Sequence, residues 1–451
     1  MINVDDRFFP PALKDKVSAY GDLALESLKH LQRSAGVHSS FSGWFNYPQN
    51  SGFTLEADVK GFVDNIDQFY DCVVVIGIGG SSLGAKAVFE ALAHKYVLSV
   101  KTAHKPLLFL GDNISERTFI ETLDLLAHKN PFVVAISKSG TTTEPAVALR
   151  VMREWLKQKY PGSSVRERLA VVTDKSSGAL RKYAEAKQIP SFVIPNNIGG
   201  RFSVLTAVGL LPLALCGIDI HNLMKGANEF FTDLANHANV KNPVVKYACL
   251  RHAAYEAGYP LEILAFNEPQ LKSLSDWFKQ LFAESQGKNG KGIFPVELML
   301  TTDLHSLGQF VQEGKRLFFE TFLNFKDPFP RRSGVERNLR IPKSTGDSDD
   351  LDYVETRLIR EVNNTALDGT LVAHADGGVP CLKVTMDELN EKNIGYLIAF
   401  FEVACALGAD LLNVNPYDQP GVESYKQNLY GLLGKPGFES YGEQIKKRLH
   451  E

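Results

Sequence analysis

Cysteine is scarce in this chain. Its 451 residues include five cysteines, which are widely scattered and form no Cys-x-x-Cys pair. An odd, scattered set excludes the disulfide framework of small secreted proteins, and the missing pair argues against a thiolate zinc site. The N-terminus, Met1 to Arg7, lacks the basic and apolar regions of a signal peptide. We therefore expect a protein that stays in the reducing cytoplasm.

An excess of positive charge is also missing. Lys and Arg total 49 against 52 Asp and Glu, which gives a formal net charge of -3. Nothing in this balance attracts a nucleic acid, so we expect no nucleic-acid partner. Any phosphate that the protein binds must be met by groups gathered locally.

A clear membrane span is absent from the sequence. The longest uncharged stretch, residues 202–218, approaches spanning length but contains Gly209 and Pro212. We interpret it as a buried core helix and expect no membrane role. The chain also has no short repeat or low-complexity tract, and its 44% hydrophobic and 22% charged residues are typical of a globular protein with two or more domains.

What the sequence does contain is a series of short apolar runs, rich in β-branched residues, that alternate with helical stretches. Continuous apolar strands separated by helices predict parallel sheets covered on both faces. The runs are residues 72–76, 106–110, 132–136, 169–173 and 192–194, and then 261–266, 296–301, 316–321 and 382–385.

The two series predict an α/β protein with two doubly wound subdomains, joined by an apolar helix around residues 204–218. We expect an N-terminal helical segment, residues 1–44 with a helix over 13–33, to pack on the second subdomain. The first subdomain would then span 45–212 and the second 213–451. The polar stretch 329–352 is interpreted as a surface excursion. Chemistry in such sheets gathers in loops at the carboxyl ends of strands.

Two of these loops suit a phosphate. The first is Ile76-Gly-Ile-Gly-Gly-Ser-Ser-Leu-Gly84, whose glycines allow close backbone approach and whose helix start offers N–H groups to an anion. It is neither a dinucleotide fingerprint nor a P-loop, because Ser82 replaces the third glycine and Ala85-Lys86 follow Gly84. The second is Ser137-Lys-Ser-Gly-Thr-Thr-Thr-Glu-Pro145, which gathers hydroxyls and one lysine. Either loop alone could be an ordinary tight turn, but two at equivalent places favour a ligand site.

These loops resemble those of the sugar isomerase (SIS) fold, and specifically the phosphoglucose isomerase family. Three further motifs and the segment around His305 occur in the family's order: Gly199-Gly-Arg-Phe-Ser203, Glu284-Ser-Gln-Gly-Lys288 and Asp418-Gln-Pro-Gly-Val-Glu-Ser-Tyr-Lys426. The resemblance covers nearly the whole chain. It implies an SIS-type fold and an enzyme that interconverts glucose 6-phosphate and fructose 6-phosphate through ring opening and a cis-enediolate. It implies no cofactor and no metal.

The resemblance also implies a role for each site residue. Glu284 would transfer the proton, Arg201 would stabilise the enediolate, and His305 and Lys426 would open the sugar ring. His305 would come from the neighbouring subunit of a homodimer or larger homo-oligomer. The implied substrate-binding residues are Gly80, Ser81, Ser137, Lys138, Ser139, Thr142, Glu144, Gly200, Gln280 and Gln419.

The residues themselves support some of these roles and leave others open. Glu284 ends an apolar helical run, where partial desolvation would make it a stronger base, and Gln280 lies one helical turn earlier on the same face. Gly199 and Gly200 let the chain bring Arg201 close to a ligand. Without the resemblance, His305 would be a packed or capping side chain. Lys426 would be a surface lysine on a C-terminal helix, after the strand-like residues 411–415.

Three departures from long family members mark the short bacterial-type branch. Gly140 and Thr143 replace bulkier residues, and Pro420 replaces an aromatic one. Rival interpretations are an isomerase that also accepts mannose 6-phosphate, a sugar-phosphate sensor in gene regulation, and a nucleotide-dependent dehydrogenase. The sensor would need a helix-turn-helix or basic surface, which the sequence does not show. The broken glycine fingerprint argues against the dehydrogenase.

Overall fold

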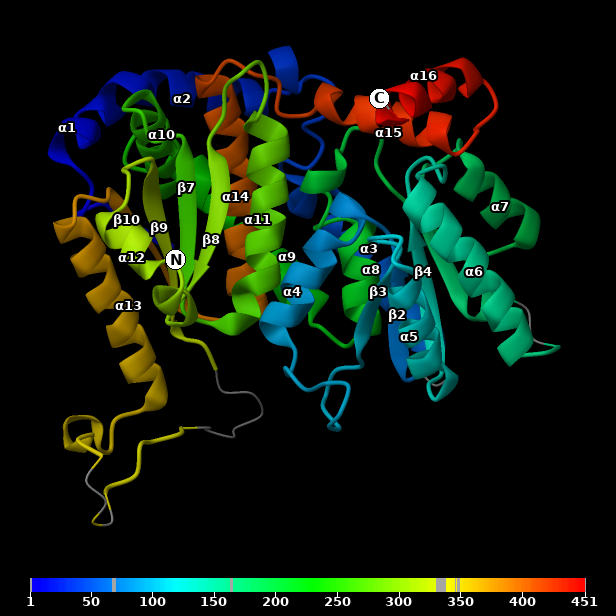
Figure 1. Ribbon diagram of the computed structural model, residues 1–451, viewed down its shortest axis with the longest axis horizontal. Coiled ribbons are helices and arrows are strands. Elements are labelled where there is room, and N and C mark those ends of the chain that lie inside the picture. The colour runs from blue at the N-terminus through cyan, green and yellow to red at the C-terminus, as the bar shows by residue number, and fades with distance from the viewer. Residues whose placement is uncertain are drawn as a thin grey trace.

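Two five-stranded sheets form the framework of the molecule (Figure 1). The computed structural model describes residues 2–66, 70–162, 165–329, 338–344, 346 and 349–450. Arg331, Arg332 and Ser348 of the predicted surface excursion lie outside the described residues. The α/β class and the two doubly wound sheets predicted from the sequence are confirmed.

The first sheet is parallel throughout and has the order β3-β2-β4-β5-β6. The second has the order β1-β10-β9-β7-β8 and is parallel except for β1, which pairs antiparallel with β10. The strands are β1 (Asn3–Asp5), β2 (Cys72–Ile76), β3 (Leu107–Leu110), β4 (Pro131–Ile136), β5 (Leu169–Thr173), β6 (Ser191–Val193), β7 (Leu261–Phe266), β8 (Phe294–Met299), β9 (Phe318–Asp327) and β10 (Cys381–Glu388).

Continuous apolar sequence explains the central strands. Every residue of β2 and β4 is buried, as expected of parallel strands with helices on both faces. All nine predicted strands are present. β9 runs six residues further than expected, to Asp327. β1 was not predicted, because three residues are too few to show a pattern.

Helices flank both sheets, and α4, α9, α11 and α14 lie between them (Figure 1). The helices are α1 (Pro11–Lys14), α2 (Lys16–Gln32), α3 (Phe53–Ile66), α4 (Leu83–Leu92), α5 (Glu116–Ala127), α6 (Thr143–Lys159), α7 (Ala179–Lys187), α8 (Ala207–Leu215), α9 (Ile220–Asn236), α10 (Pro243–Glu256), α11 (Lys272–Gln286), α12 (Gly308–Glu313), α13 (Ile359–Asp376), α14 (Glu391–Leu411), α15 (Glu423–Leu432) and α16 (Glu439–His450).

The helix expected over residues 13–33 is divided into α1 and α2, and α2 packs against α10 and α14. The expected apolar helix around 204–218 is the shorter α8. Thr206 caps α8 by accepting a hydrogen bond from the Val208 N–H, and Gly217 follows its end with φ +83°. The expected subdomain boundary between residues 212 and 213 falls inside α8, and the division of the chain at that point stays a prediction.

One predicted element is wrong. The sequence predicts a strand-like segment at residues 411–415, but Leu411 ends α14 and the following residues form no regular structure. Asn413 has φ +55°, a left-handed conformation that asparagine tolerates and that a strand does not permit. The chain therefore turns after α14 and enters an irregular loop, residues 412–419.

Helix α14 is long, apolar and mostly buried. By length and composition alone it could cross a membrane, but 83% of its most apolar window is buried inside the molecule. It packs against α9, α10 and α11. This is the pattern of a central core helix. The buried core helix that the sequence predicts within residues 202–218 is also confirmed, since eight of the nine residues of α8 are buried.

A carboxyl group lies within this core. The Glu402 side chain of α14 is 1% exposed, and its Oε1 has no hydrogen-bond partner among the described residues. Burial raises the pKa of Glu402 well above its ordinary value. The folded state therefore keeps a proton that the unfolded chain releases once the pH exceeds the unfolded pKa, so stability falls as pH rises through that range.

We predict that Glu402→Gln raises the melting temperature at about pH 8 and that this gain shrinks towards about pH 4, where Glu402 of the unfolded chain is also mostly protonated. Thermal unfolding followed by circular dichroism at both pH values measures the difference. The control is Glu443→Gln, on the exposed face of α16. A shift that is the same at both pH values, or a loss of stability at pH 8, would contradict the prediction.

Candidate active site

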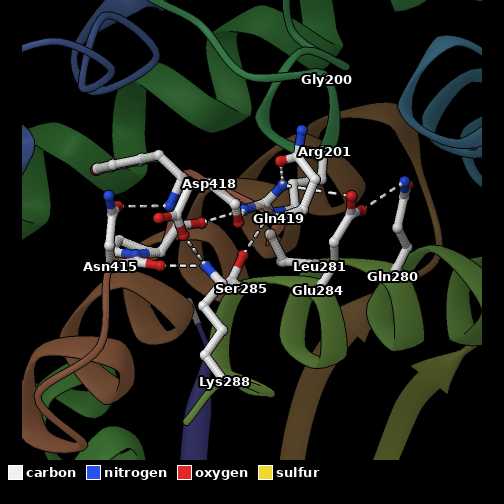
Figure 2. Close-up of polar contacts among 12 residues, drawn as sticks. Gly200, Arg201, Gln280, Leu281, Glu284, Ser285, Lys288, Asn415, Asp418 and Gln419 are labelled. Atoms are coloured by element: carbon white, nitrogen blue, oxygen red, sulfur yellow. Dashed lines mark hydrogen bonds and ion pairs between the residues drawn. The ribbon is translucent and has the colours of Figure 1, made fainter. Parts of the chain in front are cut away.

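A carboxylate and a guanidinium face one another at the end of α11 (Figure 2). Glu284 lies in the last turn of α11, and Arg201 lies in the 3-10 turn η6 (Gly200–Phe202). Arg201 Nη1 is 3.6 Å from Glu284 Oε1, with the arginine side chain 4% exposed and the glutamate side chain 27% exposed. The cation is thus enclosed, while the carboxylate keeps an open side.

The guanidinium of Arg201 is held mainly by neutral acceptors. Its Nε donates to Ser285 Oγ at 2.7 Å and its Nη1 to Gln419 Oε1 at 3.1 Å. Its Nη2 donates to the Asp418 carbonyl at 3.2 Å and also to the Pro416 carbonyl. Burial lowers the pKa of Arg201, and the Glu284 carboxylate opposes that shift. Because an arginine stays charged even so, this is a fixed cation in a dry setting.

Gln280 holds the other side of the carboxylate. Its Nε2 donates to Glu284 Oε2 at 3.0 Å, so the predicted spacing of one helical turn is confirmed. Its Oε1 is buried and has no hydrogen-bond partner among the described residues. Figure 2 shows Glu284 between Gln280 and Arg201.

The glycine-rich loop after β2 lies directly on the turn that carries Arg201. An added Cβ at Gly80 would be 2.2 Å from the carbonyl carbon of Gly200, so only glycine fits there. Ser203 Oγ donates to the Gly200 carbonyl at 2.6 Å and reaches the Gly80 carbonyl at 3.4 Å. An added Cβ at Gly79 would be 2.9 Å from Gln280 Nε2. Three segments, including the short 3-10 turn η4 (Gly79–Ser81), therefore meet at one point.

The second predicted phosphate loop follows β4, the strand next to β2. Ser137 Oγ accepts a hydrogen bond from the Gly140 N–H at 2.9 Å, and Ser139 Oγ accepts one from the Thr141 N–H at 3.2 Å. A hydroxyl that accepts from the loop can still donate its own proton to a phosphate oxygen. Lys138 Nζ donates to the Asn196 carbonyl at 3.0 Å, and partial burial lowers the pKa of this lysine.

Helix α6 begins directly after this loop. Thr142 stands at its N-cap without a side-chain capping hydrogen bond, and Glu144 lies in its first turn. The first N–H groups of a helix lack partners within the helix and favour an anion. The loop and the start of α6 thus present donors at the carboxyl end of the sheet.

The structure gives a local reason for glycine at position 140. Gly140 has φ +73°, and an added Cβ would be 2.3 Å from the backbone nitrogen of Leu180. Helix α7 therefore lies too close to the loop for any larger residue at position 140.

His305 and Lys426 lie apart from this group. Within the described residues, neither has a hydrogen bond or ion pair with Glu284 or Arg201. His305 ends the exposed 3-10 turn η8 (Thr302–His305). Lys426 lies on α15 and donates to Glu423 Oε1 at 2.8 Å, a bond that raises the pKa of Lys426.

Sequence reasoning missed several groups around Arg201. Ser285 accepts a hydrogen bond from Arg201, and Lys288 pairs with Asp418, whose carbonyl accepts another. Both residues stand in the motif that contains Glu284, and their place beside the predicted base was the available signal. The carbonyl groups of Pro416 and Asp418 gave no signal, because every residue carries a carbonyl. In the part of the chain that the structure describes, no group of three His, Cys, Asp or Glu residues could hold a metal ion.

Comparisons with known proteins agree with this geometry. The family profile described as phosphoglucose isomerase matches residues 65–432. The chain belongs to the phosphoglucose isomerase family. It is 45% identical to the glucose-6-phosphate isomerase of Fusobacterium nucleatum over 426 residues, 93% of this chain and 92% of that protein. It is 41% identical to the enzyme of Clostridium tetani over 453 residues, 100% of this chain and 99% of that protein.

Solved structures show the same fold. A hypothetical protein from Thermus thermophilus matches with a TM-score of 0.85 and 28% identity, over 96% of this chain and all of that chain. A glucose-6-phosphate isomerase from Chlamydia trachomatis matches with a TM-score of 0.71 and 22% identity, over 88% of this chain and 77% of that chain. The expected SIS-type fold is confirmed.

The family membership decides between the rival interpretations. This phosphoglucose isomerase family member is an aldose-ketose isomerase that interconverts glucose 6-phosphate and fructose 6-phosphate, a reaction of glycolysis and gluconeogenesis. The non-enzymatic sensor and the nucleotide-dependent dehydrogenase are therefore set aside.

The contact between Gly80 and Gly200 generates a prediction. A methyl group at Gly80 must displace the Gly200–Arg201 backbone, so we expect Gly80→Ala to lower kcat/KM for fructose 6-phosphate by roughly 100-fold. A coupled dehydrogenase assay measures the product. The matched control is Gly61→Ala in α3, where an added Cβ meets nothing within 4 Å. Equal activity of the two variants would show that the close contact does not matter.

Proposed function

We propose that Glu284 is the base of this isomerase and that Arg201 stabilises the intermediate. In the open-chain sugar, Glu284 would take the proton from C2 of the aldose and return it to C1, and the negative charge would develop on the enediolate oxygens. A fixed cation beside that charge lowers the barrier without having to reorient. The observation that carries the proposal is the ion pair at 3.6 Å with the open side of Glu284.

The phosphate would bind at the two loops of the first sheet. Ser81, Ser137, Lys138, Ser139 and Thr142 supply hydroxyls and one ammonium group for its oxygens. The backbone at Gly80 and Gly200, with Gln280, Gln419 and Glu144, would line the sugar. Binding energy spent on this remote group holds C1 and C2 against Glu284 without taking part in bond making.

Ring opening needs an acid and a base, which we assign to His305 and Lys426. His305 is exposed and lies near two exposed apolar side chains, Leu307 at 44% and Phe310 at 53%. Apolar groups gathered beside an exposed histidine suit an interface between subunits. This supports a homo-oligomer in which His305 completes the neighbour's site.

The cytoplasm is the compartment that we propose for this enzyme. All five cysteines are buried and free, as a reducing compartment would keep them. Activity with mannose 6-phosphate should be compared with activity on glucose 6-phosphate, because these two aldoses differ only in the configuration of one hydroxyl group.

The role of Glu284 is tested by Glu284→Gln. The amide keeps the shape but cannot accept the proton, so we expect folding and substrate binding to persist while kcat falls by roughly 100- to 10,000-fold. The assay converts fructose 6-phosphate with EDTA present. Full wild-type activity under EDTA excludes an essential chelatable metal, and its loss would contradict a mechanism that uses side chains alone. The control variant is Glu313→Gln, at an exposed position of α12. Near-normal turnover of Glu284→Gln would remove this residue from the role.

The shared site is tested by mixing two inactive variants. In a mixed dimer, His305→Ala and Glu284→Gln fall in the same site only if His305 comes from the neighbouring subunit; otherwise each site carries one of the two changes. If His305 crosses the interface, each mixed dimer has one intact site. Subunit exchange in an equal mixture should then restore about a quarter of wild-type activity. If mass measurements demonstrate subunit exchange and no activity returns, His305 acts within its own subunit's site or lies outside catalysis.

A further inference from the structure

The irregular loop from Asn415 to Gln419 carries three of the acceptors of Arg201. They are the carbonyls of Pro416 and Asp418 and the side chain of Gln419. Figure 2 shows Asp418 and Gln419 beside Arg201. The loop follows α14 and belongs to no helix or strand. Its position is therefore not fixed by a regular hydrogen-bond ladder. Whatever holds this loop also determines where the guanidinium points.

Lys288 holds the loop at both ends. Its Nζ donates to the Asn415 carbonyl and lies 2.8 Å from Asp418 Oδ1. The lysine side chain is 8% exposed, whereas Asp418 is 55% exposed. An ammonium group is costly to bury unless it is paired, so its two oxygen partners fix it in place. Figure 2 shows Lys288 reaching from the end of α11 to Asn415 and Asp418.

A second contact fixes the middle of the same loop. The Tyr417 hydroxyl is 2.8 Å from His38 Nδ1, and the tyrosine ring lies 5.6 Å from that of Phe202. Phe202 directly follows Arg201. The loop is thus attached to the arginine's own turn at its centre and to the end of α11 at its ends.

The segment from Glu284 to Lys288 therefore contacts the guanidinium by two routes. Ser285 accepts from it directly, and Lys288 acts through the loop. We propose that Lys288 is a positioning residue that keeps the Pro416 and Asp418 carbonyls on Arg201, so that the cation points at the developing enediolate. This inference rests on the proposed roles of Arg201 and Glu284.

The test separates transition-state stabilisation from substrate binding. The two phosphate loops do not depend on Lys288, so Lys288→Met should leave KM for fructose 6-phosphate within about twofold while kcat falls roughly 10- to 100-fold. A planar hydroxamate sugar phosphate that mimics the enediolate should lose affinity by the same factor as kcat/KM. A merely structural role would not produce this matched loss.

Lys291 provides the matched control. Its Nζ also donates from the segment after α11 to a carbonyl after α14, that of Leu412, at 2.9 Å. That carbonyl does not contact Arg201. Lys291→Met should therefore keep wild-type kcat and inhibitor affinity.

Asp418→Asn provides a second variant whose folding is not in question, because the side chain is exposed. It removes the ion pair with Lys288 but leaves the Asp418 carbonyl in the chain. We expect a smaller loss of kcat than in Lys288→Met, and a double variant no worse than Lys288→Met alone, since both changes act on one contact. If Lys288→Met does not fold, wild-type kcat in Asp418→Asn overturns the proposal.

Three results would overturn the positioning role: unchanged kcat in Lys288→Met, an equal loss in Lys291→Met, or a loss confined to KM with inhibitor affinity intact. Failure of the underlying mechanism has a different signature. If Glu284→Gln keeps near-normal turnover, the proposed function fails whatever Lys288 does. If Glu284→Gln is inactive and Lys288→Met is not, only the positioning role fails.

Discussion

A buried cation is the constraint around which this molecule is organised. The Arg201 guanidinium is enclosed, and each of its donors must find an acceptor, because an unpaired charge in a dry interior is costly. Its acceptors come from the end of α11 and from the loop after α14, while the glycine loop after β2 lies against its backbone. Providing hydrogen-bond acceptors for this one side chain therefore brings segments from both halves of the fold to a single point.

The fold could be predicted where sequence pattern and burial coincide. The central strands β2, β4 and β5 are continuous apolar runs and are fully buried, and burial on both faces requires that composition. Prediction failed where the structure depends on context. The short strand β1 forms by pairing with β10, which its own sequence does not indicate. The apolar residues within 411–415 suggest a strand, but Asn413 adopts a left-handed conformation and turns the chain. The end of a helix and the start of a strand can carry the same residue types, so composition alone did not distinguish them at residues 411–415.

For the candidate site, too, the sequence predicted some features and missed others. The motifs identified Glu284, Gln280, Arg201 and Gln419, which the structure brings together. They could not identify backbone carbonyls as partners of Arg201, since a carbonyl has no residue type. The motifs also named His305 and Lys426, but these two side chains lie on exposed elements and have no hydrogen bond or ion pair with Glu284 among the described residues. Motifs report which side chains are present, whereas contacts depend on where loops are held.

The close approach of α7 to Gly140 has a consequence for how such proteins change over time. The left-handed backbone at residue 140 and the backbone of Leu180 occupy each other's space. A lineage with this arrangement cannot acquire a bulky residue at 140 in one step, because the helix must move first. The residue at position 140 and the placement of α7 should therefore vary together among relatives, and a bulky residue at 140 would itself report that α7 sits further from the loop after β4.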